Sequence, residues 1–308
     1  MFDPIDLNWF ISGLSLSVPL IFAALGGLLS ERAGVINLAL EGMMLFGAFV
    51  GVAVSWWTGS PWLGVAGALF VGGLLGLIHA WFSVTVRANQ IVSATAINLF
   101  AAGLTAALIP AIWSSSGSSD AVNSFGPTSI PILRDLPWIG PIFADLNAFD
   151  YCALLLAPLL WVMLYRTSFG LRLRSCGESA SAAASVGVNV IRIRYQAVVL
   201  SGVLAAAGGV YLSLSELERF QRNMINGRGF LALAALIFGR WRPLPAVGAC
   251  LLFGMADAYQ LRAQTRGIAV PTEVLQALPY LIGLAALALV VGRRAAAPAG
   301  IGQPYVKD

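Results

Sequence analysis

Long runs of apolar residues, separated by short polar segments, dominate this chain. About eight of them approach the roughly 20 residues that an α-helix needs to cross the hydrocarbon core of a membrane. These runs lie near residues 10–30, 38–57, 63–86, 91–113, 150–166, 195–214, 244–261 and 275–292. Because lipid offers backbone groups no hydrogen-bond partner, such runs predict helices. We expect an all-α fold, a polytopic transmembrane helical bundle of about 8 to 10 spans, in one domain over residues 1–308.

One further apolar run is too short to span a membrane. Residues 230–239 read FLALAALIFG, and a helix of that length reaches only about 15 Å, half the hydrocarbon thickness. We therefore expect a broken or short helix at 230–239, which is re-entrant or leans on the protein around it.

Composition and charge strengthen the membrane assignment and suggest an orientation. The chain is 58% hydrophobic and 10% charged, against roughly 25% charged in soluble proteins. Five arginines crowd residues 166–194, Arg87 separates two predicted spans, and Arg293 and Arg294 follow the last one. Because basic loops stay in the cytoplasm, we assign these segments there. Alternation then places the N-terminus and the loop 114–149 outside the cytoplasm, and the C-terminus inside.

The chain lacks the residues that several kinds of chemistry require. Lys307 is the only lysine and follows no phosphate-binding glycine loop, so the chain is not expected to be an ATPase of the P-loop type. His79 is the only histidine and the acidic residues are scattered, so no metal site is predicted. We expect no enzyme, no metal and no cofactor in this chain, which leaves transport.

Several polar residues fall within or beside predicted spans. Asn37 and Glu41 are four apart and are expected to share a helix face at the start of the second span. A glutamate there is costly unless it is paired or faces water, so Glu41 either belongs to a pathway or bonds a neighbouring backbone. Polar residues in the fourth span either line a solute path or join helices by hydrogen bonds. The candidate pathway and substrate residues are Asn37, Glu41, Gln90, Thr95, Asn98 and Phe230.

Two transport mechanisms remain open. A secondary transporter needs an ion or proton site, for which Glu41 and the short segment 230–239 are candidates. A pump subunit driven by a separate ATPase needs instead a cytoplasmic element that docks on that partner.

Residues 171–194 have the properties of such a docking element. Residues 178–186 favour a helix, with Glu178 expected in its first turn and Gly187 as its stop. The small, nearly uncharged surface of alanine and serine suits insertion into a groove on another protein. The arginines on both sides, on chain leaving the membrane, are expected to bind lipid headgroups, acidic groups of a partner, or both.

Three sequence blocks resemble a known family. LRSCGESASAAASVGVNV is similar to the coupling loop (LRxxGExxxAAxxxGI) of permease subunits in ABC importers for branched-chain amino acids, simple sugars and nucleosides. ERAGVINLALEGMMLFGAF (31–49) and GRGFLALAALIFGRWRP (227–243) agree as well, and the first of these looks most like the nucleoside and simple-sugar branch. The chain departs from the family pattern at Ser179 and Ala180.

The resemblance implies a coupling loop at 171–194 and a set of partners. The implied coupling residues are Gly177, Glu178, Ala182, Ala183 and Gly187, with Arg174 beside them. The implied partners are ATP-binding subunits that carry ATP-Mg, a second homologous permease subunit in a heterodimer, an extracytoplasmic solute-binding protein and membrane lipid, with no nucleic acid. The implied function is alternating-access uptake of nucleosides or related small polar solutes by a multi-pass protein of a bacterial inner (plasma) membrane.

Overall fold

The computed structural model describes residues 7–115, 117–126, 128, 146–266, 270–290 and 297–306. Within this part of the chain the regular elements are all helices, beside one isolated β-bridge between Ser118 and Gln221. The predicted all-α transmembrane bundle is confirmed. Arg293, Arg294 and Lys307, and residues 129–145 of the predicted outer loop, lie outside the described residues. That residues 1–308 form one domain stays a prediction.

The transmembrane and connecting helices follow the predicted order. They are α1 (Leu7–Arg32), α2 (Leu40–Thr58), α3 (Pro61–Ala80), α4 (Gln90–Trp113), α7 (Ala148–Arg166), α8 (Ser168–Glu178), α9 (Ala180–Ser185), α10 (Val190–Tyr211), α11 (Arg228–Phe238), α12 (Pro243–Thr265) and α13 (Thr272–Val290). Short π-helical turns, η1 (Trp81–Thr85) and η2 (Leu212–Glu216), extend α3 and α10.

Each predicted span coincides with a helix. In the described part of the chain, seven helices are long and apolar enough to cross a membrane, namely α1, α2, α3 with η1, α4, α7, α10 with η2, and α12. Residues 228–238 and 274–285 form shorter apolar helices. The count of about 8 to 10 thus comprises seven full-length helices and these two shorter ones.

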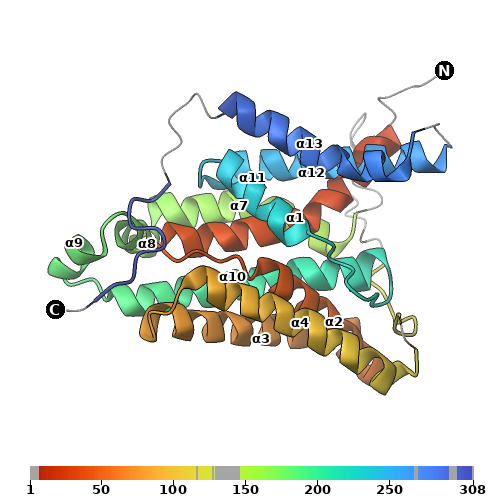
Figure 1. Ribbon diagram of the computed structural model, residues 1–308, viewed down its shortest axis with the longest axis horizontal. Coiled ribbons are helices and arrows are strands. Elements are labelled where there is room, and N and C mark those ends of the chain that lie inside the picture. Colours follow the sequence, from red (N-terminus) through yellow and green to blue (C-terminus); the bar gives the residue numbers. More distant parts are fainter. Residues whose placement is uncertain are drawn as a thin grey trace.

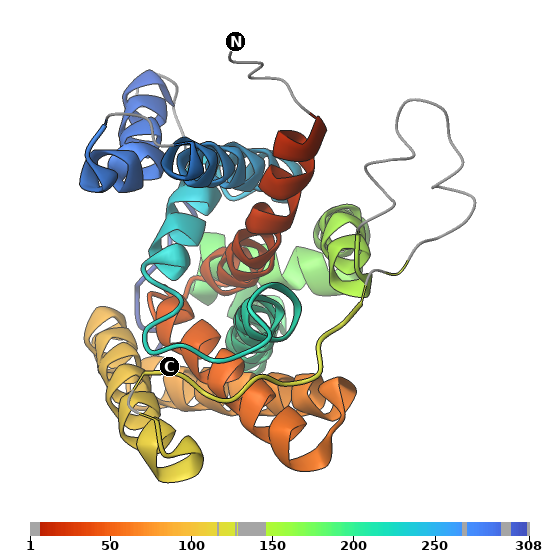
Figure 2. The same ribbon diagram turned by 90° about the vertical axis from the view of Figure 1, so that its right-hand side faces the viewer.

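Small residues allow the central helices to approach closely. Figure 2 looks along the bundle and shows α3 and α4 on one side, α12 and α13 on the opposite side, and α1 and α10 between them. A Cβ added at Gly202 of α10 would lie 2.2 Å from the carbonyl oxygen of Gly72 in α3. Backbones that pack this tightly leave room only for glycine, as in many membrane helix pairs.

The short segment at 230–239 is an interior helix. α11 has 11 residues and packs against α1, α2, α12 and α13. In Figure 1 it begins near the middle of the long axis and runs toward the end that carries α8 and α9. The surrounding helices therefore support a helix that covers only half the depth of a membrane.

The two ends of the bundle carry different connections. α8, α9 and residues 297–306 lie at one end in Figure 1, and residues 117–126 and the connection after η2 lie at the other. This arrangement agrees with the predicted separation of the 171–194 loop from the 114–149 loop. Which end faces the cytoplasm stays a prediction.

Candidate functional site: a central helix junction and a coupling element

Glu41 joins the start of α2 to the start of α11. Its Oε1 accepts a hydrogen bond from the backbone N–H of Gly227, and its Oε2 accepts one from Gly229, both at 2.8 Å. The first N–H groups of a helix have no partner within the helix, and a carboxylate there is favoured by the helix dipole. Glu41 therefore caps α11 from a different helix. Two roles were predicted for Glu41, and the structure shows the second of them, hydrogen bonds to a neighbouring backbone.

Two glycines make this contact possible. Gly227 has a φ of +85°, which L side chains rarely adopt. A Cβ added at Gly229 would lie 2.5 Å from the backbone nitrogen of Glu41 and 2.8 Å from its Oε2. The LALEG and GRGF segments, nearly 190 residues apart, thus fit each other directly. We call Glu41, Gly227 and Gly229 the central junction.

α12 and α13 also reach the start of α11. The guanidinium of Arg228 lies 3.8 Å from the carboxylate of Asp257 on α12, and both side chains are mostly buried. The hydroxyl of Tyr280 on α13 donates to the carbonyl of Asn226 at 3.4 Å. The pair of Arg228 and Asp257 compensates part of the cost of burying each charge.

Asn37 lies outside α2, so the prediction that it shares a helix face with Glu41 is wrong. α2 begins at Leu40, and Asn37 is completely buried in the non-helical segment before it. Its side-chain oxygen accepts from the N–H of Ala39 at 3.0 Å, and its Nδ2 donates to Ser201 Oγ at 2.9 Å. Asparagine bonds its own nearby backbone in this way and so competes with helix formation.

Two of the three candidate residues on α4 bind the segment that leads to the central junction. Gln90 Oε1 accepts from Ile36 N, and Asn98 Oδ1 accepts from Gly42 N, both at 2.8 Å. Asn98 also donates to Leu38 O at 2.9 Å. Thr95 is exposed and donates to Ile91 O of its own helix. For Gln90 and Asn98, the geometry therefore agrees with the second alternative, in which polar residues of α4 hold neighbouring segments by hydrogen bonds.

Phe230 lies on α11 with about half of its surface exposed (48%). Its role at a solute pathway, like that of Thr95, stays a prediction.

The predicted coupling element, which we continue to call the coupling element, consists of α8 and α9, two helices with a break between them. Glu178 is the last residue of α8, so the prediction that it lies in the first turn of the coupling helix is wrong. Ser179 is extended and its hydroxyl accepts from the N–H of Ala182 at 3.3 Å, which makes it the N-cap of α9. Gly187, with φ +85°, follows the end of α9 as predicted. Arg172 and Arg174 lie on α8.

The candidate coupling residues divide into a buried and an exposed group. Glu178, Ala182 and Gly187 are exposed, whereas Gly177 and Ala183 are buried. A Cβ at Gly177 would lie 2.1 Å from the carbonyl oxygen of Arg32. Ala182 and Gly187 are accessible to a partner, whereas Glu178 is exposed but also contacts other parts of the chain. The two buried residues shape the element.

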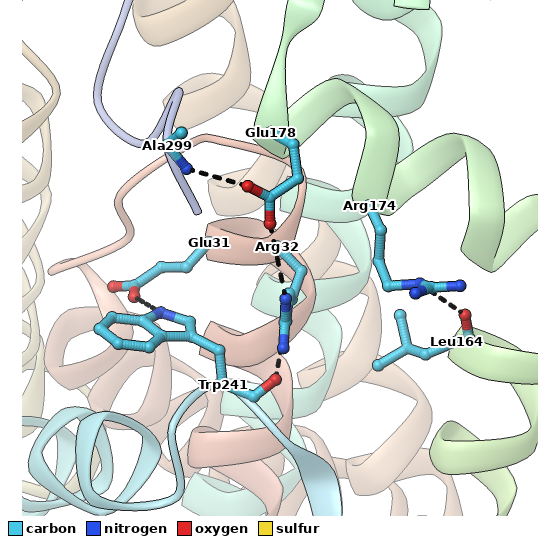
Figure 3. A network of polar contacts seen from close by, with 7 residues as sticks. All are labelled: Glu31, Arg32, Leu164, Arg174, Glu178, Trp241 and Ala299. Carbon is cyan, nitrogen blue, oxygen red and sulfur yellow. Dashed lines mark hydrogen bonds and ion pairs between the residues drawn. The ribbon is translucent and has the colours of Figure 1, made fainter. Parts of the chain in front are cut away.

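Arginines hold this element to the bundle. Arg174 donates to the carbonyl of Leu164 at 3.0 Å (Figure 3) and lies over the ring of Tyr165. Arg194 was expected at the surface, but it is buried (1% exposed) and donates to the carbonyls of Ala33 and Gln303. Arg194 thus satisfies backbone groups of the fold and is not available to a lipid or a partner.

The C-terminal segment (residues 297–306) binds the end of α8, a contact that the sequence reasoning missed. Figure 3 shows Glu178 between Arg32, 3.9 Å away, and the N–H of Ala299, which donates to it at 3.3 Å. The N–H of Gly300 donates to Gly177 O at 2.8 Å, and that of Gly302 donates to Gly34 O at 3.0 Å. This segment therefore links the coupling element to the chain between α1 and α2.

A second set of contacts at this end involves the connection before α12. Arg32 Nε donates to the carbonyl of Trp241 at 2.7 Å, and the indole N–H of Trp241 donates to Glu31 (Figure 3). The end of α1 is thus bound on one side by the coupling element and on the other by the connection between α11 and α12.

The fold defines a membrane protein of many spans, with the helices α8 and α9 at one end of the bundle. Residues 9–288 match the family described as the branched-chain amino acid transport system permease component, and the chain belongs to it. A component of this kind is a transport subunit and not itself an enzyme, and it works with ATP-binding and substrate-binding components.

Three relatives match over nearly the whole chain. The Guanosine ABC transporter permease protein NupQ of Bacillus subtilis (strain 168) is 40% identical over 301 residues, with 94% of each chain covered. The Nucleoside ABC transporter permease protein NupC of Lactococcus lactis subsp. cremoris is 38% identical over 95% of this chain and 94% of its own. The Putative glucose ABC transporter permease protein TsgC13 of Haloferax volcanii is 35% identical over 94% of both chains.

Proposed function

We propose that this chain is the transmembrane subunit of an ATP-driven importer that moves nucleosides or related small polar solutes by alternating access. The observation that carries the ATP-driven mechanism is the coupling element, in which Glu178, Ala182 and Gly187 are exposed while Gly177 and Ala183 fix the element to the bundle. The similarity to NupQ and NupC supports nucleosides as the substrate class.

The proposed partners supply what this chain lacks. ATP-Mg binds to separate ATP-binding subunits, and α9 inserts into a groove on one of them. A second homologous permease subunit completes the pathway as a heterodimer, and an extracytoplasmic binding protein delivers the solute. The assembly lies in the inner (plasma) membrane of a bacterium, in contact with its lipids.

A continuous set of contacts leads from the coupling element to the central junction. Gly177 packs on the carbonyl of Arg32, and Gly300 and Gly302 join α8 to Gly34. The segment after Gly34 runs to Glu41, where Gln90 and Asn98 hold it before it reaches α11. We infer that movement of α9 displaces the start of α2 together with α11, and so changes the pathway.

The proton-coupled alternative loses its main candidate residue. Both carboxylate oxygens of Glu41 accept backbone hydrogen bonds in the central junction, so this carboxylate serves to hold α11 in place. A hexose is the second candidate substrate, favoured by the similarity to TsgC13.

Uptake by the assembled transporter tests this proposal. The permease pair, the ATP-binding subunits and the binding protein are reconstituted in proteoliposomes with labelled guanosine, glucose and leucine. We expect ATP-dependent uptake of guanosine that a protonophore leaves unchanged. Uptake that a protonophore abolishes and that is indifferent to ATP would contradict the mechanism, and uptake of glucose alone would contradict the substrate class.

A further inference from the structure

Two exposed arginines, at the end of the bundle that carries α8 and α9, line a polar pocket that the proposed function does not use. The pocket has a volume of about 460 Å³ and lies between the start of α8, the loop after α9 and the start of α10. Arg172 and Arg192 contribute its positive charge, and Ser168, Asn189 and Gln196 contribute neutral polar groups. We call it the arginine pocket.

The charge of the arginine pocket is not neutralised by the chain itself. In residues 166–196 the only acidic residue is Glu178, which faces Arg32 at the end of α1. Among the described residues, no carboxylate lies within 4 Å of the guanidinium of Arg172 or Arg192. Two cations beside one pocket therefore favour an anionic ligand.

An apolar groove continues from the arginine pocket along α10. The groove has a volume of about 490 Å³ and is lined by Leu77, Tyr195, Val199 and Leu200, and it shares Phe169 and Gln196 with the pocket. Residues 192, 196 and 199 or 200 lie on one face of α10, because they follow the helical spacing of three to four. At 1.5 Å per residue, the distance from Arg192 to Leu200 is about 12 Å, close to the hydrocarbon depth of one leaflet, roughly 15 Å.

We propose that the arginine pocket and the groove together bind one anionic phospholipid. The phosphate and headgroup lie between Arg172 and Arg192, and an acyl chain lies in the groove on α10 beside Leu77 of α3. Arginines such as Arg172 and Arg192, on helices where a span ends, lie at the level of the lipid headgroups. Each basic residue there contributes about 1 kcal/mol of attraction to anionic lipid.

The groove favours a lipid over an ATP-binding subunit. An ATP-binding subunit that docks on α9 meets the exposed end of the bundle, whereas Val199 and Leu200 lie two to three turns into a helix that spans the membrane. Only a molecule that is itself in the membrane reaches both the guanidinium groups and this apolar surface. The proposal does not depend on the solute that the transporter moves.

Native mass spectrometry of the full chain in detergent, titrated with phosphatidylglycerol or phosphatidylcholine, tests the site. We expect the wild-type chain to bind one phosphatidylglycerol at least tenfold more tightly than phosphatidylcholine. The double variant Arg172→Gln with Arg192→Gln should lose this preference, because each arginine contributes roughly fivefold to it. The control, Arg87→Gln with Arg166→Gln, removes two positive charges outside the pocket and should keep the preference.

A second variant tests the acyl-chain part independently of charge. Leu200→Asn places an amide in the groove and should weaken phosphatidylglycerol binding several-fold. Leu99→Asn, the same change at an exposed leucine of α4 outside the groove, should not. Glycerol phosphate at the same concentration should not displace the lipid, because it lacks the chain. The proposal is overturned if glycerol phosphate competes equally, if the arginine variant keeps the lipid preference, or if that variant loses only assembly with the ATP-binding subunit.

Discussion

The central junction and the coupling element are both built on a glycine packed against backbone, but they differ in what they leave exposed. In the junction, Glu41 has both oxygens bonded to α11, and Gly229 has no room for a Cβ. In the coupling element, Gly177 is equally confined, yet three of the six residues of α9 are exposed and only Ala183 is buried. The central junction is enclosed by other parts of the chain, whereas the coupling element leaves part of its surface exposed.

This difference separates two kinds of substitution. Changes in the central junction alter contacts within the chain, so they should lower stability and uptake together. Changes on the exposed side of α9 remove no internal contact, so they should lower uptake alone. Measuring both quantities for each variant, in the reconstituted transporter and in the purified chain, tests the distinction.

Gly229→Ala should have the largest effect on stability. The added Cβ would meet the backbone of Glu41 at 2.5 Å, and overpacking against backbone costs about 3 kcal/mol. Thermal unfolding in detergent should show a clear fall in Tm, with uptake lost as well. Gly103→Ala on α4, where nothing lies within 4 Å, is the matched control and should leave Tm unchanged or raised. Equal behaviour of the two variants would contradict the closed junction.

Glu41→Ala should be the next most destabilising change. It leaves the N–H groups of Gly227 and Gly229 without a partner in a half-buried site, at a cost of about 2 kcal/mol. Glu41→Gln keeps one acceptor and should lose about half as much. If Glu41→Ala kept its Tm but lost only uptake, Glu41 would act on solute or protons and not as a cap.

Ala182→Arg should affect uptake without affecting stability. The side chain is exposed on α9, so a bulky charge there blocks insertion into a partner groove and should lower ATP-dependent uptake at least tenfold, or about 1.4 kcal/mol. Gly117→Arg adds the same charge in open space at the opposite end of the bundle and should be silent. Full uptake by Ala182→Arg would remove α9 from the docking surface.

Removal of residues 297–308 should have the smallest effect on uptake. It removes the hydrogen bonds from Gly300 and Gly302 to Gly177 and Gly34, each worth about 1 kcal/mol. The contact of Ala299 with Glu178 and one acceptor of Arg194, the carbonyl of Gln303, are lost as well. We expect a Tm lowered by a few degrees and less uptake per ATP hydrolysed. Removal of residues 307–308 alone is the control. An unchanged ratio of uptake to hydrolysis would show that the segment does not position α8.

The sequence predicted the elements well because apolar length and small-residue content are local properties. The spans, the interior helix at 230–239 and the stop at Gly187 all follow from composition within one segment. The two wrong helix boundaries are both effects of a polar side chain. Asn37 bonds its own backbone before α2, and Ser179 caps α9 and so separates Glu178 from it. The free energies of such alternative helix boundaries differ by about 1 kcal/mol. The pattern of hydrophobic residues does not reveal so small a difference.

The contacts between distant segments could not be predicted from one sequence. For Glu41 the residue type alone left two uses open, and only the position of Gly227 and Gly229 decides between them. Arg194 looks like the other arginines around the coupling element, yet it alone is buried because Ala33 and Gln303 present their carbonyls to it. Residues 297–306 bind through backbone groups, which every sequence possesses.

The C-terminal segment also sets an order of events during synthesis. Residues 300 and 302 donate to Gly177 and Gly34, which leave the ribosome more than a hundred residues earlier. Until α13 has been inserted, the end of α8 lacks these bonds and the contact of Ala299 with Glu178. The surface that we propose for an ATP-binding subunit therefore takes its final shape only after every described helix has been made, which would delay docking on half-built chains.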